Sequence, residues 1–282
     1  MSGREAPREG GLLDAIVAAV RARVARQRDA VPLRSVAAAA ELRQPRGTRF
    51  REAIAGRDRI NVIAECKRRS PARGVLARVY RPADIARAYE SGGAAAVSVL
   101  TEPAFFDGAI EHLEVVRQAV GLPVLRKDFI VDEYQVFEAR AAGADAVLLI
   151  VAVLGRDGLR ALATRAAELG LAVIVEVHSR PELDDAAGSG AAIIGVNSRN
   201  LRTLDVDLGV CGTLIDAAPA GAVMVAESGV RSRDDIARLR AIGYHAFLIG
   251  ERLMTAADPR AALAALVAPA PLCRGEHGGG AA

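Results

Sequence analysis

Lysine is rare in this sequence, and both lysines follow short apolar runs. Of the 37 basic residues, only Lys67 and Lys127 are lysines, and all others are arginines. Arginine stays protonated at any working pH, whereas a partly buried lysine can release its proton. An arginine-rich coding bias would leave the same pattern, and Lys127 could instead form an ion pair with Asp128. Because both lysines end apolar runs, we favour proton transfer, which is worth about 10²–10⁴-fold in rate.

Three glutamates end similar apolar runs. Glu176 ends the segment Val173-Ile-Val-Glu176, where a carboxylate requires a partner. Glu176 is therefore either a general base or one half of an ion pair. Glu65 and Glu227 allow the same two interpretations, since each could simply hold a lysine in place.

Two glycine-containing turns have the composition of phosphate-binding loops. The stretches Glu227-Ser-Gly-Val-Arg231 and Ile249-Gly-Glu-Arg252 each follow an apolar run, and the first leads into a helical stretch. The N-terminus of a helix binds phosphate through backbone N–H groups. Gly229 and Gly250 would allow an anion to approach the backbone closely, and Ser228 adds a hydroxyl. The alternative is that both glycines only form tight turns.

Aromatic residues are scarce, and three of them follow apolar runs. Phe105, Phe106 and Phe129 could flank a planar ring, although core packing explains any one of them equally well. His178 lies two residues after Glu176, but no second histidine follows at ligand spacing. We therefore predict no metal site.

Eight apolar runs alternate with helical stretches from residue 61 onward. No Asn-Gly hairpin signal separates them, so they predict parallel strands. Eight such units in roughly 200 residues form a (β/α)8 barrel. A doubly wound sheet is the alternative, but the first turn lacks the G-x-G-x-x-G pattern. The runs are 61–67, 94–100, 123–127, 145–151, 172–177, 192–197, 223–228 and 246–250.

A barrel would gather the candidate residues at one mouth. Its active site lies at the carboxyl ends of the strands, and the loops after strands seven and eight commonly bind phosphate. Side chains two positions apart on a strand point to the same face. Lys67 can therefore point into the mouth with Glu65, and Arg199 with Asn197.

The chain divides into three predicted parts. Residues 1–56 form a helical extension, in which apolar residues at helical spacing, beginning with Leu13 and Ile16, indicate an amphipathic helix. About fifty residues cannot form a core alone, so we expect this extension to pack on the barrel. Residues 57–268 form the barrel, and 269–282 are expected to be a flexible tail.

Composition excludes several classes of protein. A net charge of +3 is spread along the chain and aromatics are 4%, so no basic stripe with stacking residues indicates nucleic acid binding. The longest apolar run, 146–154, is too short to span a membrane, and the N-terminus lacks the pattern of a signal peptide. Three widely spaced cysteines indicate no disulfide framework. We expect a cytoplasmic enzyme that is a monomer or a weak homo-oligomer.

These motifs together resemble the indole-3-glycerol phosphate synthase family. The resemblance runs from about Leu12 to about Asp258 and includes the amphipathic extension. One departure is Cys66, where the family usually has an aliphatic or aromatic residue; we expect it to face the helices. The matching stretches are Ile63–Pro71, Ser98–Glu102, Phe106–Gly108, Leu125–Ile130, Val175–Val177, Gly195–Leu201, Val225–Val230 and Leu248–Met254.

The resemblance implies a carboxy-lyase that closes 1-(2-carboxyphenylamino)-1-deoxyribulose 5-phosphate to indole-3-glycerol phosphate. Carbon dioxide and water are lost, and no cofactor or metal is implied. Lys127 would be the general acid for ring closure, and Glu176 its acid/base partner in dehydration. Lys67, held by Glu65, would lie near the substrate carboxylate.

The resemblance also implies how the substrate is held. Asn197 and Glu227 would orient the ribulose hydroxyls and the lysines. The phosphate would lie against Ser228, Gly229, Gly250 and Glu251, with Glu251 acting through its backbone. The anthranilate ring and its carboxylate would contact Arg199, Phe106, Phe129 and Ser70.

Two competing hypotheses remain from the residues. A sister phosphate-binding barrel, such as phosphoribosylanthranilate isomerase or the tryptophan synthase α subunit, would share the phosphate loops. It would not explain two lysines paired with Glu65 and Glu176. The second hypothesis is a non-catalytic barrel that binds a phosphorylated ligand. Against it, the candidate residues at the strand ends all keep side chains or backbone types that the reaction needs.

Overall fold

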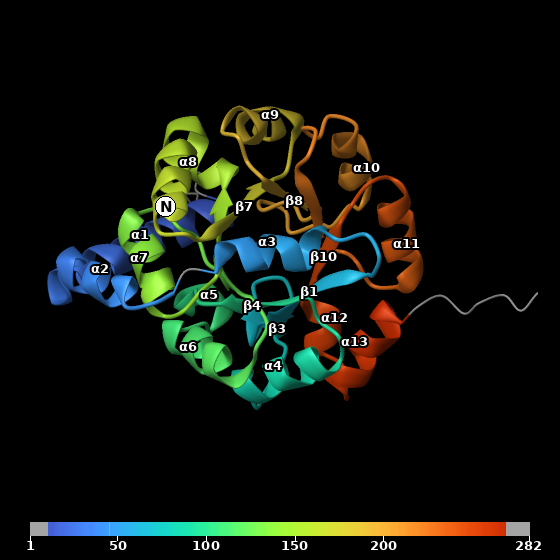
Figure 1. Cartoon of the computed structure of the whole chain (residues 1–282), viewed down its shortest axis with the longest axis horizontal. Coiled ribbons are helices and arrows are strands. Elements are labelled where there is room, and N and C mark those ends of the chain that lie inside the picture. The colour runs from blue at the N-terminus through green and yellow to red at the C-terminus, as the bar shows by residue number, and fades with distance from the viewer. Residues whose placement is uncertain (1–10, 45, 269–282) are drawn as a thin grey trace, which may run out of the picture.

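Eight parallel strands close into a barrel, as the apolar runs predict. The computed structural model describes residues 11–44 and 46–268. Neighbouring strands pair in the order β1-β10-β9-β8-β7-β6-β5-β4, and the ring closes between β4 and β1 (Figure 1). The (β/α)8 prediction is therefore confirmed. The strands are β1 (Asn61–Cys66), β4 (Ala96–Leu100), β5 (Val124–Lys127), β6 (Ala146–Ile150), β7 (Ala172–Val177), β8 (Ile193–Asn197), β9 (Val223–Glu227) and β10 (Ala246–Ile249).

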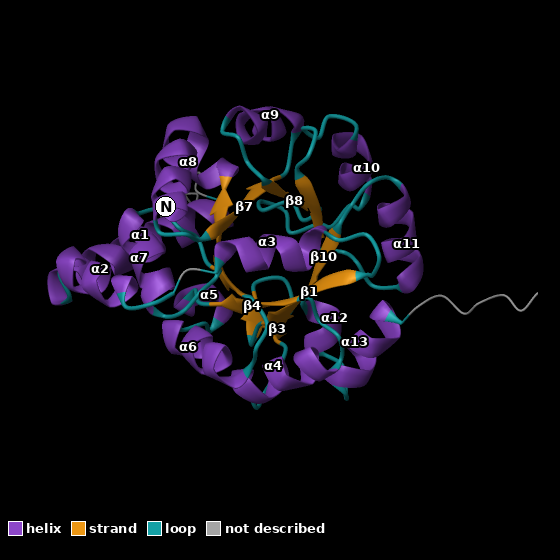
Figure 2. Cartoon of the chain, in the orientation of Figure 1, coloured by secondary structure: helices purple, strands orange, loops and turns teal. Residues whose placement is uncertain are grey.

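Helices surround this ring of strands (Figure 2). The outer helices are α4 (Pro82–Ser91), α6 (Ile110–Ala119), α7 (Glu133–Ala141), α8 (Val151–Glu168), α9 (Arg180–Gly188), α10 (Gly209–Ile215), α11 (Arg233–Ala241) and α13 (Pro259–Val267). Short elements occupy the loops that follow β1, β4 and β10. They are β2 (Arg69–Ser70), β3 (Gly74–Val75), α5 (Pro103–Phe106) and α12 (Glu251–Met254). The antiparallel pair β2–β3 has no Asn-Gly turn signal, and the sequence did not predict it.

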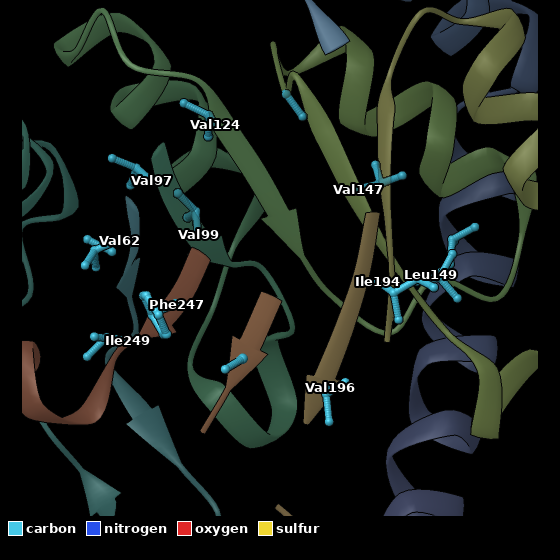
Figure 3. Close-up of a cluster of buried hydrophobic side chains, with 14 of the residues drawn as sticks. Val62, Val97, Val99, Val124, Val147, Leu149, Ile194, Val196, Phe247 and Ile249 are labelled. Atoms are coloured by element: carbon cyan, nitrogen blue, oxygen red, sulfur yellow. The ribbon is translucent and has the colours of Figure 1, made fainter. Parts of the chain in front are cut away.

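Alternate residues of the strands supply two separate cores. One set packs against the surrounding helices and includes Val62, Val97, Val147 and Phe247 (Figure 3). Cys66 belongs to this outer core, as expected from its position next to Glu65. The other set fills the interior of the barrel and includes Ile63, Leu125, Leu148, Ile174 and Val225. Both cores are needed because a parallel barrel strand is buried on both faces.

Three helices precede the barrel, and they pack on it as predicted. They are α1 (Leu12–Ala30), α2 (Leu33–Glu41) and α3 (Gly47–Ala55). Helix α3 lies across the ring of strands in Figure 1, and its buried Phe50 and Ile54 extend the interior core. Helix α1 buries Ile16, Val20 and Val24 in the same core.

Two predicted features fall outside the described residues. The flexible tail at 269–282 is one, and the first ten residues of the extension are the other. Within residues 11–44 and 46–268, no helix combines the length and the apolar character needed to cross a membrane.

Candidate active site

A cavity of about 470 Å³ opens at the carboxyl ends of the barrel strands. Both lysines line it, together with most of the residues that the sequence singled out. Ser70 does not; it lines an adjoining cavity of about 80 Å³. The predicted residues that line the larger cavity are Glu65, Lys67, Phe106, Lys127, Phe129, Glu176, Asn197, Arg199, Glu227, Ser228, Gly229, Gly250 and Glu251.

Lys127, the last residue of β5, binds two carboxylates from across the barrel. Its Nζ lies 2.9 Å from Oε2 of Glu176 on β7 and 3.5 Å from Oε2 of Glu227 on β9. Both carboxylates are almost completely buried. Asp128 forms ion pairs with Arg23 and Arg126 instead, so the alternative of a Lys127–Asp128 pair is wrong.

Lys127, Glu176 and Glu227 shift one another's pKa values. Burial disfavours the Lys127 ammonium, but the charges of Glu176, Glu227 and Glu65 outweigh it and raise the pKa of Lys127. Burial opposes ionisation of Glu176 as well, but Lys127 and then His178 hold the pKa of Glu176 below its ordinary value. Burial together with the negative charge of Glu176 raises the pKa of Glu227 to about 8. At neutral pH the site therefore holds a Lys127–Glu176 ion pair beside a Glu227 that is mostly protonated.

Lys67 and Glu65 form a second ion pair at the end of β1. The Nζ of Lys67 lies 2.5 Å from Oε2 of Glu65, as predicted from their spacing. A Cβ atom at position 250 would collide with the Glu65 carboxylate. Gly250 therefore makes room for this carboxylate, a packing reason that the sequence alone did not indicate.

Asn197 and Arg199 extend the site at the end of β8. The Oδ1 of Asn197 accepts a hydrogen bond from the backbone N–H of Arg199 at 3.0 Å. The guanidinium of Arg199 donates to the carbonyl of Leu204 at 2.8 Å and lies 3.8 Å from Oε2 of Glu251. The structure thus brings both residues to the cavity, as their shared face predicts.

The turn after β9 has an unusual backbone. Ser228 and Gly229 both have positive φ, at 62° and 81°. A side chain at 229 would collide with Val206, 2.7 Å from the position of a Cβ atom. Within the described residues, neither backbone N–H donates a hydrogen bond to another backbone carbonyl. Consecutive backbone N–H groups in such a turn form an anion-binding concavity.

Aromatic and apolar side chains form the opposite wall. The rings of Phe106 and Phe129 lie 6.1 Å apart between centroids, inclined by 36°. Both rings also line the smaller cavity, which Leu12 and Ile16 of α1 complete. The N-terminal extension therefore contributes side chains to the neighbourhood of the site.

Sequence reasoning missed Arg73, which lies on the loop between β2 and β3. Its guanidinium binds Oε1 of Glu251 at 2.9 Å, and it lines the larger cavity. The carboxylate of Glu251 thus lies between Arg73 and Arg199, whereas the sequence predicted a contribution from its backbone. No signal distinguishes Arg73 from the other arginines of the chain.

Comparison with known proteins identifies the family. A family model of indole-3-glycerol phosphate synthase matches residues 13–266, which include most of the extension and all eight barrel strands. The chain belongs to the indole-3-glycerol phosphate synthase family.

Curated indole-3-glycerol phosphate synthases align with the chain over most of their length. The protein of Mycobacteroides abscessus is 46% identical over 258 residues, covering 92% of this chain and 94% of its own. That of Nocardioides sp. is 49% identical over 253 residues, covering 89% and 96%. That of Leifsonia xyli subsp. xyli is 50% identical over 239 residues, covering 85% and 91%.

Solved structures at low identity share the barrel fold with this indole-3-glycerol phosphate synthase family member. A thiamine phosphate pyrophosphorylase from Pyrococcus furiosus has a TM-score of 0.57 at 20% identity, covering 73% of this chain and 93% of that one. An N-acetylmannosamine-6-phosphate 2-epimerase from Clostridium perfringens has a TM-score of 0.56 at 13% identity, covering 71% and 89%. At this identity the likeness concerns the fold alone.

Proposed function

We propose that the chain closes 1-(2-carboxyphenylamino)-1-deoxyribulose 5-phosphate to indole-3-glycerol phosphate, releasing carbon dioxide and water. The observation that carries the proposal is the contact of the Lys127 ammonium with Glu176 and Glu227 at the cavity. Family membership supports the same reaction. The geometry provides a proton donor, a base and a buried neutral carboxyl group within one site.

Lys127 supplies the proton for ring closure in this proposal. Its acidic neighbours, above all the Glu176 carboxylate, keep it protonated. As the ring closes, the ammonium donates a proton to the substrate carbonyl oxygen, which becomes a hydroxyl. Charge then develops in a cavity largely walled by protein, where electrostatic interactions are stronger than in water. Glu176, kept ionised by Lys127, is the acid/base group of the dehydration: it takes the proton that the new ring loses and delivers it to the departing hydroxyl, which leaves as water while Glu176 becomes a carboxylate again.

The other predicted residues bind the substrate. Lys67, held by Glu65, faces the substrate carboxylate, while Asn197 and Glu227 orient the hydroxyls. The turn at Ser228 and Gly229, with its two positive φ values, and the helix start at Gly250 and Glu251 bind the phosphate. The aromatic ring lies against Phe106 and Phe129, with Arg199 and Ser70 on its carboxylate side.

The proposal places the complete reaction on one chain. Every side chain that it uses lies between residues 65 and 251 of the barrel segment 57–268. We propose in addition that the protein works in the cytoplasm as a monomer or a weak homo-oligomer. From the extension, Leu12, Leu13 and Ile16 line the smaller cavity beside Phe106 and Phe129.

Indole fluorescence tests this function directly. The sequence contains no tryptophan, so protein emission does not mask an indole product. Purified protein incubated with the carboxyphenylamino substrate is expected to develop indole emission and release carbon dioxide. The matched control is Lys127→Met, which keeps a linear apolar stem but removes the ammonium. Absence of emission with wild-type protein would favour the non-catalytic phosphate-binding barrel instead.

A further inference from the structure

His178 lies directly behind the Glu176 carboxylate. Its Nε2 is 3.4 Å from Oε1 of Glu176, whereas Lys127 binds the other oxygen, Oε2, at 2.9 Å. The Nδ1 of His178 is 3.2 Å from Oε2 of Glu182, which also accepts the backbone N–H of His178 at 2.8 Å. Glu182 lies in the first turn of α9, so the short connection from β7 to α9 fixes the imidazole between two carboxylates.

This arrangement connects a buried carboxylate with solvent. The side chain of Glu176 is 1% exposed, that of His178 is 15% and that of Glu182 is 22%. Glu176 lines the large cavity, whereas His178 is absent from the described residues that line it. A substrate that fills the cavity therefore covers Glu176, whereas the His178 side chain keeps its partial exposure outside the cavity, although its Nε2 atom is itself buried.

The surroundings of His178 favour its protonated form. Burial lowers the pKa of the imidazole, but the hydrogen bond that it donates to Glu182 and the charges of Glu176, Glu182 and Glu227 raise it above its ordinary value. The Glu176 carboxylate lies between the imidazole and the Lys127 ammonium, with one oxygen facing each. The Nε2 atom makes no hydrogen bond of good geometry with any described residue, so its proton is not committed elsewhere.

The reaction proposed above needs a supply of protons. The substrate carboxylate leaves as neutral carbon dioxide, and a hydroxyl group leaves as water. Each turnover therefore consumes one proton from solvent. Lys127 is left as a neutral amine after donating its proton, and its contacts with Glu176 and Glu227 lie at the bottom of an occupied cavity.

We propose that His178, held by Glu182, returns this proton from solvent to Lys127 through Glu176. The inference rests on the proposed function. The N–H bond at Nε2 breaks as an O–H bond forms on Oε1 of Glu176, leaving a neutral imidazole and a carboxylic acid. Rotation of the carboxyl group presents the proton to the Lys127 amine, which regains its charge as Glu176 becomes a carboxylate again. Because Nε2 is buried and Nδ1 contacts Glu182, the imidazole ring then turns to bring its unprotonated nitrogen to solvent, where it takes a new proton.

His178 is a positioning and proton-supply residue in this scheme, and His178→Gln removes the proton but keeps a polar side chain. With enzyme in excess over substrate, the first turnover uses the proton already on Lys127, so its rate is expected to stay within about twofold of wild type. The multiple-turnover kcat is expected to fall about tenfold or more with KM unchanged, because every later turnover waits for a proton. Imidazole added to the buffer is expected to restore much of kcat.

Glu182→Gln is a second, independent variant. It leaves the imidazole in place but removes the charge that stabilises its protonated form, so kcat is expected to decline at a lower pH than in wild type. The matched control is His245→Gln, since His245 lies at the opposite end of the barrel beside the start of β10. Thermal unfolding of all three variants identifies any that fail to fold.

Three outcomes would overturn the relay. One is a multiple-turnover kcat in His178→Gln within about twofold of wild type. Another is a first-turnover rate that falls in parallel with kcat and is not rescued by imidazole, which indicates a purely structural role. A third is a pH profile of Glu182→Gln identical to wild type. Failure of the proposed function is distinguishable, because wild-type protein itself would then form no indole.

Discussion

Lys127 carries its charge among three acidic residues, and these raise its pKa and thereby make it a weaker acid. The expectation from the sequence was that burial makes its proton easy to release. In the structure the charges of its acidic neighbours, with Glu176 first, have the larger effect and raise its pKa. The proton is therefore held until the substrate carbonyl arrives and accepts it.

Lys127→Arg keeps the positive charge but removes the transferable proton, since arginine stays protonated at any working pH. We expect kcat to fall about 100-fold or more, while KM stays within about tenfold of wild type. Indole fluorescence under steady-state conditions measures both constants. Arg26→Lys, an exchange at an exposed position of α1, is the matched control. Turnover of Lys127→Arg near the wild-type level would exclude Lys127 as the acid.

Among the secondary-structure elements, an ion pair connects helix α1 of the extension with the end of strand β5, where Lys127 lies. Arg23 of α1 binds both carboxylate oxygens of Asp128, the residue after Lys127, at 3.0 and 3.1 Å. The buried Asp128 also accepts hydrogen bonds from the Thr101 hydroxyl at 2.7 Å and from Arg126 at 3.1 Å. Helix α1 thereby stabilises the end of β5, where Lys127 points into the cavity.

Arg23→Gln tests this connection without leaving Asp128 unpaired, because Thr101 and Arg126 remain. Loss of a hydrogen-bonded ion pair is expected to lower the free energy of unfolding by about 1 kcal/mol, or the Tm by about 2–4 °C. Thermal unfolding followed by circular dichroism measures the change. Arg26→Gln, on the exposed face of the same helix, is expected to leave the Tm unaltered. Equal Tm values for both variants would show that α1 is held by its apolar face alone.

For the molecule as a whole, the buried ionisable groups of the candidate active site lower the free energy of unfolding. Several ionisable groups are buried at one mouth of the barrel, where burial opposes the charge on each. Glu227 is the clearest case, because its pKa rises from an ordinary value of 4.5 to about 8. Below pH 4.5 Glu227 is protonated in both the folded and the unfolded chain, so its raised pKa does not lower the free energy of unfolding. As the pH rises from 4.5 towards 8, Glu227 ionises in the unfolded chain first, and the free energy of unfolding decreases.

Glu227→Gln replaces this group with a neutral side chain of the same shape. We expect the variant to gain Tm relative to wild type as the pH rises from 5 to 8, by roughly 7–14 °C at the upper end. Activity is expected to fall, because Glu227 contacts Lys127. Thermal unfolding across this pH range measures the gain, with Glu41→Gln at an exposed position of α2 as control. A Tm difference that does not depend on pH would contradict the raised pKa of Glu227.

Local patterns in the sequence were sufficient to predict the barrel. Each strand is a continuous apolar run, because strands of a parallel barrel are buried on both faces, and each predicted run contains one observed strand. The polar residues at the strand ends followed from the same reasoning, since all parallel strands place their carboxyl ends at one mouth. Glu65 with Lys67 could be paired because side chains two apart share a face.

Only the tertiary structure decided which distant groups meet and how their charges affect one another. Lys127 and Glu176 are 49 positions apart, and Arg23 and Asp128 are 105 apart. No local periodicity relates such residues, because their separation depends on the closure of the barrel and the path of α1 across it. The same closure selects Arg73 from among the arginines of the chain and sets the protonation of Glu227. Sequence periodicity reports burial one element at a time, whereas a pKa depends on every charge that the complete fold brings near.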